Sequence, residues 1–413
     1  MKIIYCFFML AAMVTGQVEA ANTYTLVQVV DVALTQSPSV MIAKAQEDAA
    51  TASVTTAKSY LNPQLEFGAG PSHYRDRSVS KDTKGNWGVA LSQTLEFSDV
   101  RRARREIAES GVKTAGLTSD LIRLELKVRV KNAFYNVLQK QEGLKLVEAD
   151  QQLLQTIRDR VKLKTDIGES PKYELIKAET ELLAAQRDYQ AALVRVVESK
   201  ALLRGLVGSG ISNDFELSGQ LPLSESLPRL DALRDQISQS PYLQQVRAAA
   251  EIAEAKLKLE ESLRNPGLTL KAGVEQDPDL LQYRLGLAIP LPLWTNREGQ
   301  IAEASANIRQ AQAQLGDREL GLSRDLETAY QRYLIAQGQV NAFENGLLEQ
   351  AQSVLKVAEA AYKFGERGIL EYLDAQRTYR SVRKDYLAAR YDYVAAMLEI
   401  ERLIGAELLA TKE

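Results

Sequence analysis

The chain has 413 residues, of which 25% are charged and 7% aromatic, and its formal net charge is −3. This balance is typical of a folded protein with room for two domains, and it lacks the basic excess of a nucleic-acid-binding protein. One cysteine, Cys6, and one histidine, His73, are present. A nucleophile–base pair or a soft-ligand metal site needs more such side chains, so the sequence predicts no enzyme, no metal site and no cofactor.

The first twenty residues have the pattern of a signal peptide. Lys2 precedes an apolar run from Ile3 to Val14, and Val18-Glu19-Ala20 is a small-x-small cleavage site. The run is too short to span a membrane, and no later segment has eighteen uninterrupted apolar residues. Cys6 lacks the small residues that precede a lipid-modified cysteine. We therefore expect an exported chain without a lipid anchor, a disulfide or a transmembrane helix.

The rest of the chain reads as two copies of one unit. Ser37-Pro38 recurs as Ser240-Pro241, and Gly168-Glu169 recurs as Gly365-Glu366. The predicted segments are a signal peptide at 1–20, a first repeat at 21–207, a linker at 208–229, a second repeat at 230–405 and a tail at 406–413.

Each repeat is expected to consist of a helix, two strands, a very long helix, a tight turn and a final helix. Apolar residues three and four positions apart predict helices over 25–60, 100–163, 230–263 and 297–363. The two long helices would be roughly 100 Å in length, which suits a coiled coil better than a globular core.

Between the helices the apolar period changes to two. Strands are expected at about 62–75, 86–98, 266–276 and 282–293, each as long as a tilted strand that crosses a bilayer. Aromatic residues near the strand ends would then lie at the membrane interface, and these are Trp87, Tyr283 and Trp294. A half-exposed sheet of a soluble protein is the alternative interpretation.

Four strands in lipid would leave unpaired edges, so strands of other copies must close the barrel. Two copies give eight strands, whose interior side chains fill, whereas three give twelve, which surround a water-filled pore. The predicted fold is therefore mainly α with a membrane β-barrel. Its homotrimer would form a twelve-stranded barrel and a long α-helical coiled-coil tunnel.

A tight turn ends the long helix of each repeat, and hairpin tips are expected at about 164–172 and 362–371. Gly365 and Gly368 permit positive φ in the second tip. Glu371 and Asp374 follow three residues apart, on one helical face, and would form two acidic rings in a trimer. The alternative is that these carboxylates only stabilise the first turns of a helix.

These tips and the order of elements resemble the TolC-type outer-membrane factors, over the whole mature chain. The tips have the family form Y-x-x-G-x-x-x-x-x-D-x-x-x-A, here "YKFGERGILEYLDA" at 362–375 and, more loosely, "TDIGESPKYELIKA" at 165–178. Glu371 replaces the usual aspartate. The modest length and short tail are similar to the CzcC branch, which serves heavy-metal efflux pumps of the resistance-nodulation-division type.

The resemblance implies a passive exit channel in the outer membrane of a Gram-negative bacterium. Its partners would be a periplasmic adaptor protein and an inner-membrane pump, and its cargo heavy-metal cations or, alternatively, organic drugs. By resemblance, Tyr362 and Arg367 tie the closed tip to a neighbouring hairpin, where Glu174 is the acidic partner and Tyr173 lies beside it. An exported soluble coiled-coil scaffold or adaptor is the alternative of a different class.

The tips are also the expected adaptor-docking surface, and the candidates are Gly168, Glu169, Gly365 and Glu366. A role in turn formation alone is their alternative. The run "RRARR" at 101–105 follows the second strand, so Arg101 and Arg102 would lie beside lipid phosphates. A solvated helix face explains the same run equally well.

Overall fold

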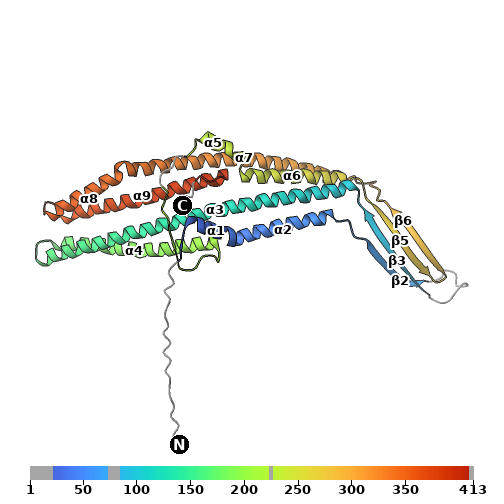
Figure 1. The fold of residues 1–413 in the computed structure, drawn as a ribbon, viewed down its shortest axis with the longest axis horizontal. Coiled ribbons are helices and arrows are strands. Elements are labelled where there is room, and N and C mark those ends of the chain that lie inside the picture. Colours follow the sequence, from blue (N-terminus) through green and yellow to red (C-terminus); the bar gives the residue numbers. More distant parts are fainter. Residues whose placement is uncertain (1–21, 73–83, 223–226, 409–413) are drawn as a thin grey trace, which may run out of the picture.

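The computed structural model describes residues 22–72, 84–222 and 227–408. The predicted signal peptide, with Cys6, and also His73 lie outside these residues. The molecule is elongated: helices lie side by side along most of its length, a sheet extends from one end, and two hairpin tips form the other (Figure 1).

Each repeat contributes one set of helices to this arrangement. The helices of the first repeat are α1 (Leu26–Gln36), α2 (Pro38–Lys58), α3 (Ser98–Asp166) and α4 (Lys172–Val207). Those of the second are α5 (Leu230–Ile237), α6 (Pro241–Ser262), α7 (Glu298–Ala342), a five-residue π-helical turn η1 (Phe343–Leu347), α8 (Leu348–Lys363) and α9 (Ile369–Ile404). The 69 residues of α3 make it roughly 100 Å long.

The single helices expected over 25–60 and 230–263 are each two helices. Ser37 and Ser240 are extended, with ψ of 132° and 145°, and each is followed by proline at the first helical position. Proline cannot donate the backbone hydrogen bond that would continue the preceding helix, and it biases the residue before it away from helical geometry. The repeated Ser-Pro pair is therefore a repeated helix boundary.

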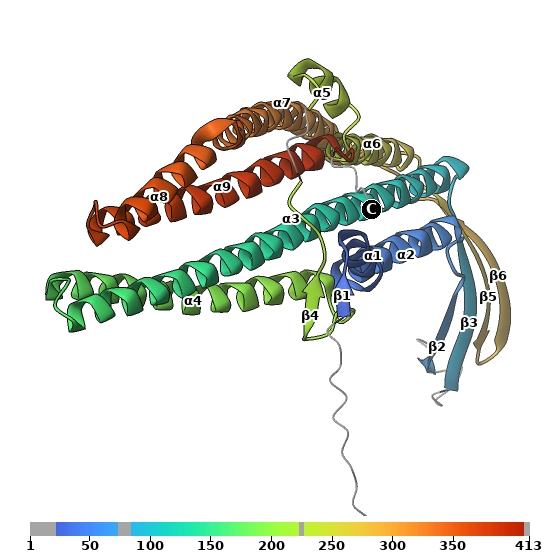
Figure 2. The same cartoon turned by 60° about the vertical axis from the view of Figure 1, so that its left-hand side comes forward.

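The helix expected over 297–363 is also interrupted. Asn345 and Gly346 have non-helical geometry, and Gly346 has φ 141°. An Asn-Gly pair is a turn signal, and glycine adopts this φ without a steric penalty. The chain changes direction here, so that α8 departs from the line of α7 (Figure 2).

Two strands from each repeat form one antiparallel sheet in the order β2-β3-β5-β6. The strands are β2 (Gln64–Ser72), β3 (Lys84–Leu95), β5 (Leu268–Asp277) and β6 (Leu280–Ala288). The last strand ends five residues before the expected end at 293, because Pro290 and Pro292 have no N–H to donate to a neighbouring strand.

The register divides the sheet into an apolar and a polar face. Leu65, Leu91, Ala272 and Leu285 are cross-strand neighbours and so lie on one face. Lys271, Glu275, Gln282 and Arg284 alternate with such residues and lie on the other, where an ion pair of 3.0 Å joins Arg284 to Glu275. Leu285 is 89% exposed, so nothing in the described chain covers the apolar face there.

The two repeats share a core in the middle of the helical part, around α3 and α9. Val130, Phe134 and Val394 are at most 1% exposed there. A small parallel sheet of β1 (Asn22–Tyr24) and β4 (Phe215–Leu217) lies beside this core and joins the start of the described chain to the linker. By length and composition, no described helix reaches a transmembrane span alone; α1 and α2 do so only together, across a 43° bend.

Candidate functional site

The two hairpin tips have the same backbone geometry. Gly168 and Gly365 have φ of 82° and 74°. The next N–H, of Glu169 or Glu366, donates to the carbonyl five residues back, over 2.8 and 2.9 Å. This arrangement is a Schellman motif, which ends α3 and α8 and satisfies their last carbonyls. All four candidate docking residues are exposed on these turns.

The second glycine of the second tip does not adopt positive φ, contrary to expectation. Gly368 has φ −74° and is the N-cap of α9, as Pro171, with φ −70°, is the N-cap of α4. A proline at the equivalent position shows that this site requires an ordinary negative φ. At the tips, only Gly168 and Gly365 adopt the left-handed backbone conformation that favours glycine.

The predicted acidic residues lie on the first turns of α9. Glu371 and Asp374 are both exposed. The guanidinium of Arg367, in the turn before α9, lies 3.4 Å from the carboxylate of Glu371, four residues later. Asp374 has no ion pair among the described residues. The outermost acid is therefore partly compensated within its own hairpin, whereas Asp374 presents its charge to solvent.

Tyr362 lies between the two hairpins and stacks on Tyr372, with ring centroids 5.8 Å apart. Its hydroxyl is buried and has no hydrogen-bond partner in the described chain. Burial and the nearby charge of Glu174 raise the pKa of Tyr362. A buried hydroxyl without a partner is costly in a folded protein, so this group is poised to accept one.

The implied pairing of Arg367 with Glu174 does not occur within one chain. The Glu174 carboxylate instead accepts a hydrogen bond from the Ser170 hydroxyl over 3.0 Å. Tyr173 is 63% exposed beside it. These groups are therefore brought to the same end of the molecule without direct contact to the arginine.

Two polar links between the hairpins escaped the sequence analysis. Arg377 of α9 forms an ion pair with Glu181 of α4. Gln376 donates to the Asp150 carboxylate of α3 over 3.4 Å, and burial raises the pKa of Asp150. Asp150 continues the apolar stripe of Leu154, Ile157 and Val161 at helical spacing, and a carboxylate in such a stripe is the signal that could have revealed this link.

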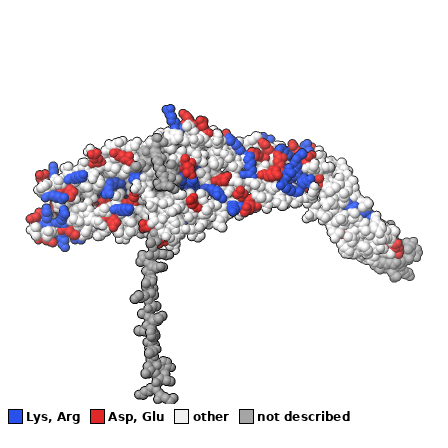
Figure 3. Space-filling model, viewed as in Figure 1, with Lys and Arg blue, Asp and Glu red and all other residues white. Residues whose placement is uncertain are grey.

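Charged side chains of both signs are intermixed over the tips, while the sheet is largely uncharged on the face in view (Figure 3). Among the described residues, no group of three or more His, Cys, Asp or Glu side chains is arranged to hold a metal ion. The intermixed charges suit the tips to electrostatic contacts.

At the other end of the helices, the predicted arginines are engaged in the junction with the sheet. Arg102 pairs with Asp99 over 2.9 Å, and the Arg101 guanidinium lies 4.1 Å from the ring centre of Tyr60. The sequence predicted that both arginines lie at this junction, but it did not predict Asp99 and Tyr60 as their partners.

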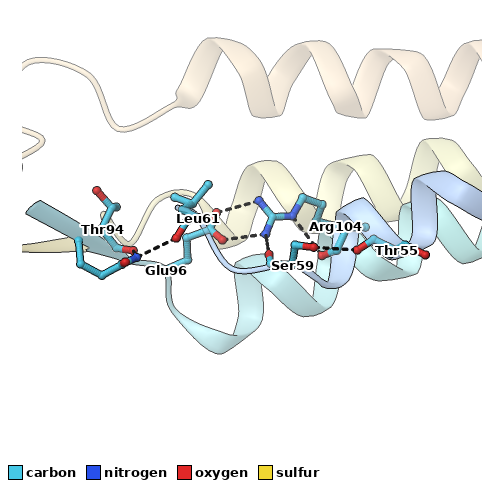
Figure 4. Close-up of polar contacts among 8 residues, drawn as sticks. Thr55, Ser59, Leu61, Thr94, Glu96 and Arg104 are labelled. Atoms are coloured by element: carbon cyan, nitrogen blue, oxygen red, sulfur yellow. Dashed lines mark hydrogen bonds and ion pairs between the residues drawn. The ribbon is translucent and has the colours of Figure 1, made fainter. Parts of the chain in front are cut away.

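Arg104 of the same run was not singled out, yet it makes the most contacts (Figure 4). Its guanidinium donates to both oxygens of Glu96, over 2.8 and 3.0 Å, and to the Ser59 carbonyl at the end of α2 over 3.3 Å. A bidentate pair of this kind fixes geometry. In the second repeat Arg297, at the start of α7, pairs with Glu260 at the end of α6, so both repeats have an arginine ion pair where the helices meet the sheet.

The aromatic residues expected at a membrane interface lie at both ends of the sheet. Trp87 and Tyr283 are on the apolar face toward the far ends of β3 and β6, opposite Gln276 and Val274 of β5. Trp294, which is 91% exposed, lies between β6 and α7, at the end that joins the helices.

Comparison with known proteins shows which family has this architecture. The family described as "Outer membrane efflux protein" matches residues 29–209 and 232–406, one match for each repeat. The cobalt-zinc-cadmium resistance protein CzcC of Cupriavidus metallidurans is 23% identical over 94% of this chain and 91% of its own length. The outer membrane protein TolC of Vibrio cholerae is 24% identical over 92% of this chain and 90% of its own.

Solved structures show the same fold. The outer membrane channel CmeC of Campylobacter jejuni superposes with a TM-score of 0.80 at 17% identity, over 94% of this chain and 87% of that one. At this level of identity the likeness concerns the fold alone.

Proposed function

This chain belongs to the outer membrane efflux protein family, and we propose that three copies of it form one continuous exit duct from the periplasm through the outer membrane. As a member of this family, it is an outer-membrane efflux protein and not an enzyme or an exported soluble scaffold. Assembly, gating, partners and cargo are the parts that we propose.

The main support for a trimer is the sheet, which has open edges, one apolar face and one polar face. Its apolar face is uncovered, and its outer strands, β2 and β6, have no partner on their outer sides within the described chain. Hydrocarbon does not tolerate such edges, so β6 of one copy would pair with β2 of the next. Three copies supply twelve strands, enough for a water-filled lumen, toward which the polar face would point.

The ends of the sheet would then lie at the two membrane interfaces. Trp87 and Tyr283 would occupy the outer interface and Trp294 the inner one. Arg101 and Arg102 lie at the same inner end and, although they have partners in the chain, would be close to lipid phosphates.

The helices would continue the barrel as a periplasmic tunnel that ends at the tips. Around the threefold axis, Glu371 and Asp374 would form two rings of three carboxylates each. Tyr362, with its unpaired hydroxyl, and Arg367 would meet Glu174 and Tyr173 of a neighbouring hairpin, which would keep the aperture closed. The long 3.4 Å pair of Arg367 with Glu371 is weak enough to exchange for such a partner.

The exposed turns would be the docking surface for a periplasmic adaptor protein. Gly168 and Gly365 bring the backbone to the surface, and Glu169 and Glu366 place a charge beside it. The adaptor would connect the duct to an inner-membrane pump of the resistance-nodulation-division type.

We further propose heavy-metal cations as the cargo, on the basis of the name of the CzcC relative. The rings of Glu371 and Asp374 favour cations electrostatically, and the described residues contain no cluster that would retain them. Deletion of the gene in its host should raise the cell content of cobalt, zinc or cadmium. A selective rise of an organic dye would instead assign the duct to drug efflux.

The first twenty residues would be removed on export, after Ala20, without lipid attachment. The measured mass of the mature chain tests this directly, since an uncleaved leader or an added lipid changes it.

The test of the trimer is the mass of the detergent-extracted particle, measured by light scattering with the detergent subtracted. We expect three protomers per particle. Leu285→Arg puts a charge on the apolar face, at a cost of about 2–4 kcal/mol at mid-bilayer, and should abolish the membrane-inserted trimer. Gln282→Arg puts the same charge on the opposite face of β6 and should leave it intact. A detergent-free monomer in the periplasm, or equal effects of both variants, would exclude the shared barrel.

A further inference from the structure

A cavity of about 570 Å³ lies between α3, α4 and α9, midway between the shared core and the tips. Its floor is apolar, with Leu146 of α3, Ala192 of α4 and Leu387 of α9. The volume is in the range of small-molecule binding sites. None of the functions proposed above uses this cavity.

The walls of the cavity are strongly basic. Seven Lys and Arg side chains line it, against two carboxylates, those of Asp150 and Asp188. Of the seven, Arg187 is paired with Asp188 and Arg377 with Glu181. Five remain without a carboxylate partner among the described residues, and these are Lys140, Arg195, Arg380, Arg383 and Lys384.

The remaining carboxylate does not neutralise this group. Asp150 is 5% exposed, and its side chain is engaged by Gln376 from α9. Arg380 and Arg383 act on Asp150 from a distance, without an ion pair to it. Cations from three helices therefore converge on one apolar-floored cavity, and like charges at short range repel each other.

We propose that this cavity binds a soluble multivalent oxyanion of the phosphate or polycarboxylate class. The guanidinium groups of Arg380 and Arg383 present paired donors that match two oxygens of such an anion. Lys140 and Arg195 would contact it from α3 and α4. The bound anion would join α9 to the α3–α4 hairpin beside the polar links that Arg377 and Gln376 already make there.

The position of the cavity selects a soluble ligand over a lipid headgroup. Along α3, Gln139 at the cavity follows Ser98 at the sheet by 41 residues, or roughly 60 Å. Phosphates of the membrane in which the sheet would lie are therefore out of reach. The proposal holds whichever cargo leaves through the duct.

Titration calorimetry of the full-length protein in detergent tests the proposal, with pyrophosphate and citrate as probes and sodium chloride at equal ionic strength as the blank. We expect saturable binding of one anion per protomer. Arg380→Gln/Arg383→Gln should weaken it at least tenfold, and Lys140→Gln alone by a smaller factor. Arg309→Gln/Arg332→Gln removes the same charge from exposed positions of α7 and should leave binding unchanged.

Three results would overturn the site. Absence of saturable binding to the unmodified protein is the first. Equal weakening by both double variants is the second, because it would indicate a diffuse charge effect. The third is binding of an acidic helical peptide with no binding of either anion, which would make the cavity a protein-docking groove. Particle mass measured in parallel separates each of these from a failure of the trimer.

Discussion

At the scale of single residues, the charge at the tip depends on which carboxylates have an ion-pair partner. Glu371 has Arg367 within 3.4 Å, whereas Asp374 has no ion pair in the described chain. Three copies of an uncompensated acid around one axis would make the stronger cation site, and that site belongs to Asp374.

We therefore predict that Asp374→Ala weakens block of the reconstituted channel by a trivalent cation such as La³⁺ at least tenfold, with Glu371→Ala less effective. Single-channel recordings measure this. Glu303→Ala removes an exposed acid of α7 far from the tip and should not change block. Arg367→Ser removes the cation that pairs with Glu371 and that would hold the tip against the neighbouring hairpin. The aperture should therefore open more easily, and conductance should rise. Unchanged block and conductance in Asp374→Ala and Arg367→Ser would remove the tip from the gate.

A buried ion pair joins the two repeats in the shared core. Lys131 of α3 and Glu401 of α9 are each 1% exposed, and their charged atoms lie 2.6 Å apart. Removal of one partner deprives the other buried charge of this ion pair, which typically costs about 3–5 kcal/mol.

Lys131→Met should accordingly lower the midpoint of denaturant unfolding, followed by circular dichroism, more than the double variant Lys131→Met/Glu401→Leu does. Replacement of a whole buried pair by apolar groups is often neutral, because no charge remains to be desolvated. Equal losses in the single and double variants would mean that loss of the pair itself, and not the buried charge left behind, determines the stability.

Some of these residue roles were accessible from the sequence and others were not. Gly168 and Gly365 follow helical runs, and a left-handed residue is the usual end of a helix, so the turns were predictable. The roles of Arg104 and Glu181 depend on which helices meet, which a local pattern does not contain. Gly368 was wrongly expected at positive φ, although the equivalent Pro171 carries the correct information.

At the scale of elements, the break within the long second helix was missed because the apolar period continues on both sides of it. The Asn345-Gly346 pair was the available signal. The strand ends were displaced for a similar reason: alternation runs on through Ile289 and Leu291, while the prolines between and after them end the strand at Ala288. Apolar periodicity identified each element, and backbone hydrogen bonding set its limits.

The break makes Gly346 sensitive to substitution. A residue with a Cβ at φ 141° is strained by about 1–3 kcal/mol, so Gly346→Ala should lower the thermal stability or force α7 and α8 toward one straight helix. Gly338→Ala, eight residues earlier inside α7, should instead stabilise by about 1 kcal/mol because alanine favours a helix.

Thermal unfolding of the two variants measures this opposition in sign. Conductance gives a second readout, since a straightened α7–α8 would carry the second tip away from the first, and only Gly346→Ala should change it. Shifts of the same sign and size in both variants would mean that the break is not held by the glycine geometry.

At the scale of the whole molecule, the sequence predicted a duplicated, mainly helical chain with one sheet at its end, because duplication and period are local properties. Which strands pair with the two edge strands of the sheet depends on the assembly of several copies, and one sequence does not contain this information. A single chain exposes β2 on one side of the sheet and β6 on the other, and in the proposed trimer the pairing between copies would convert this sheet into a barrel.

That pairing is open to a direct test because the only cysteine of the chain, Cys6, lies in the predicted signal peptide. Cysteines introduced in β2 at Leu65 or Phe67, combined with one in β6 at Tyr283 or Leu287, should form disulfides between copies wherever their Cα atoms come within about 7 Å. The expected product is a covalent trimer on a denaturing gel. Single-cysteine controls should give at most a dimer, since each copy then has one thiol. Ladders beyond three copies would indicate an open assembly. Monomers from every cysteine pair would mean that β2 and β6 do not meet. The four-stranded sheet would then enter the membrane in some other way or not at all.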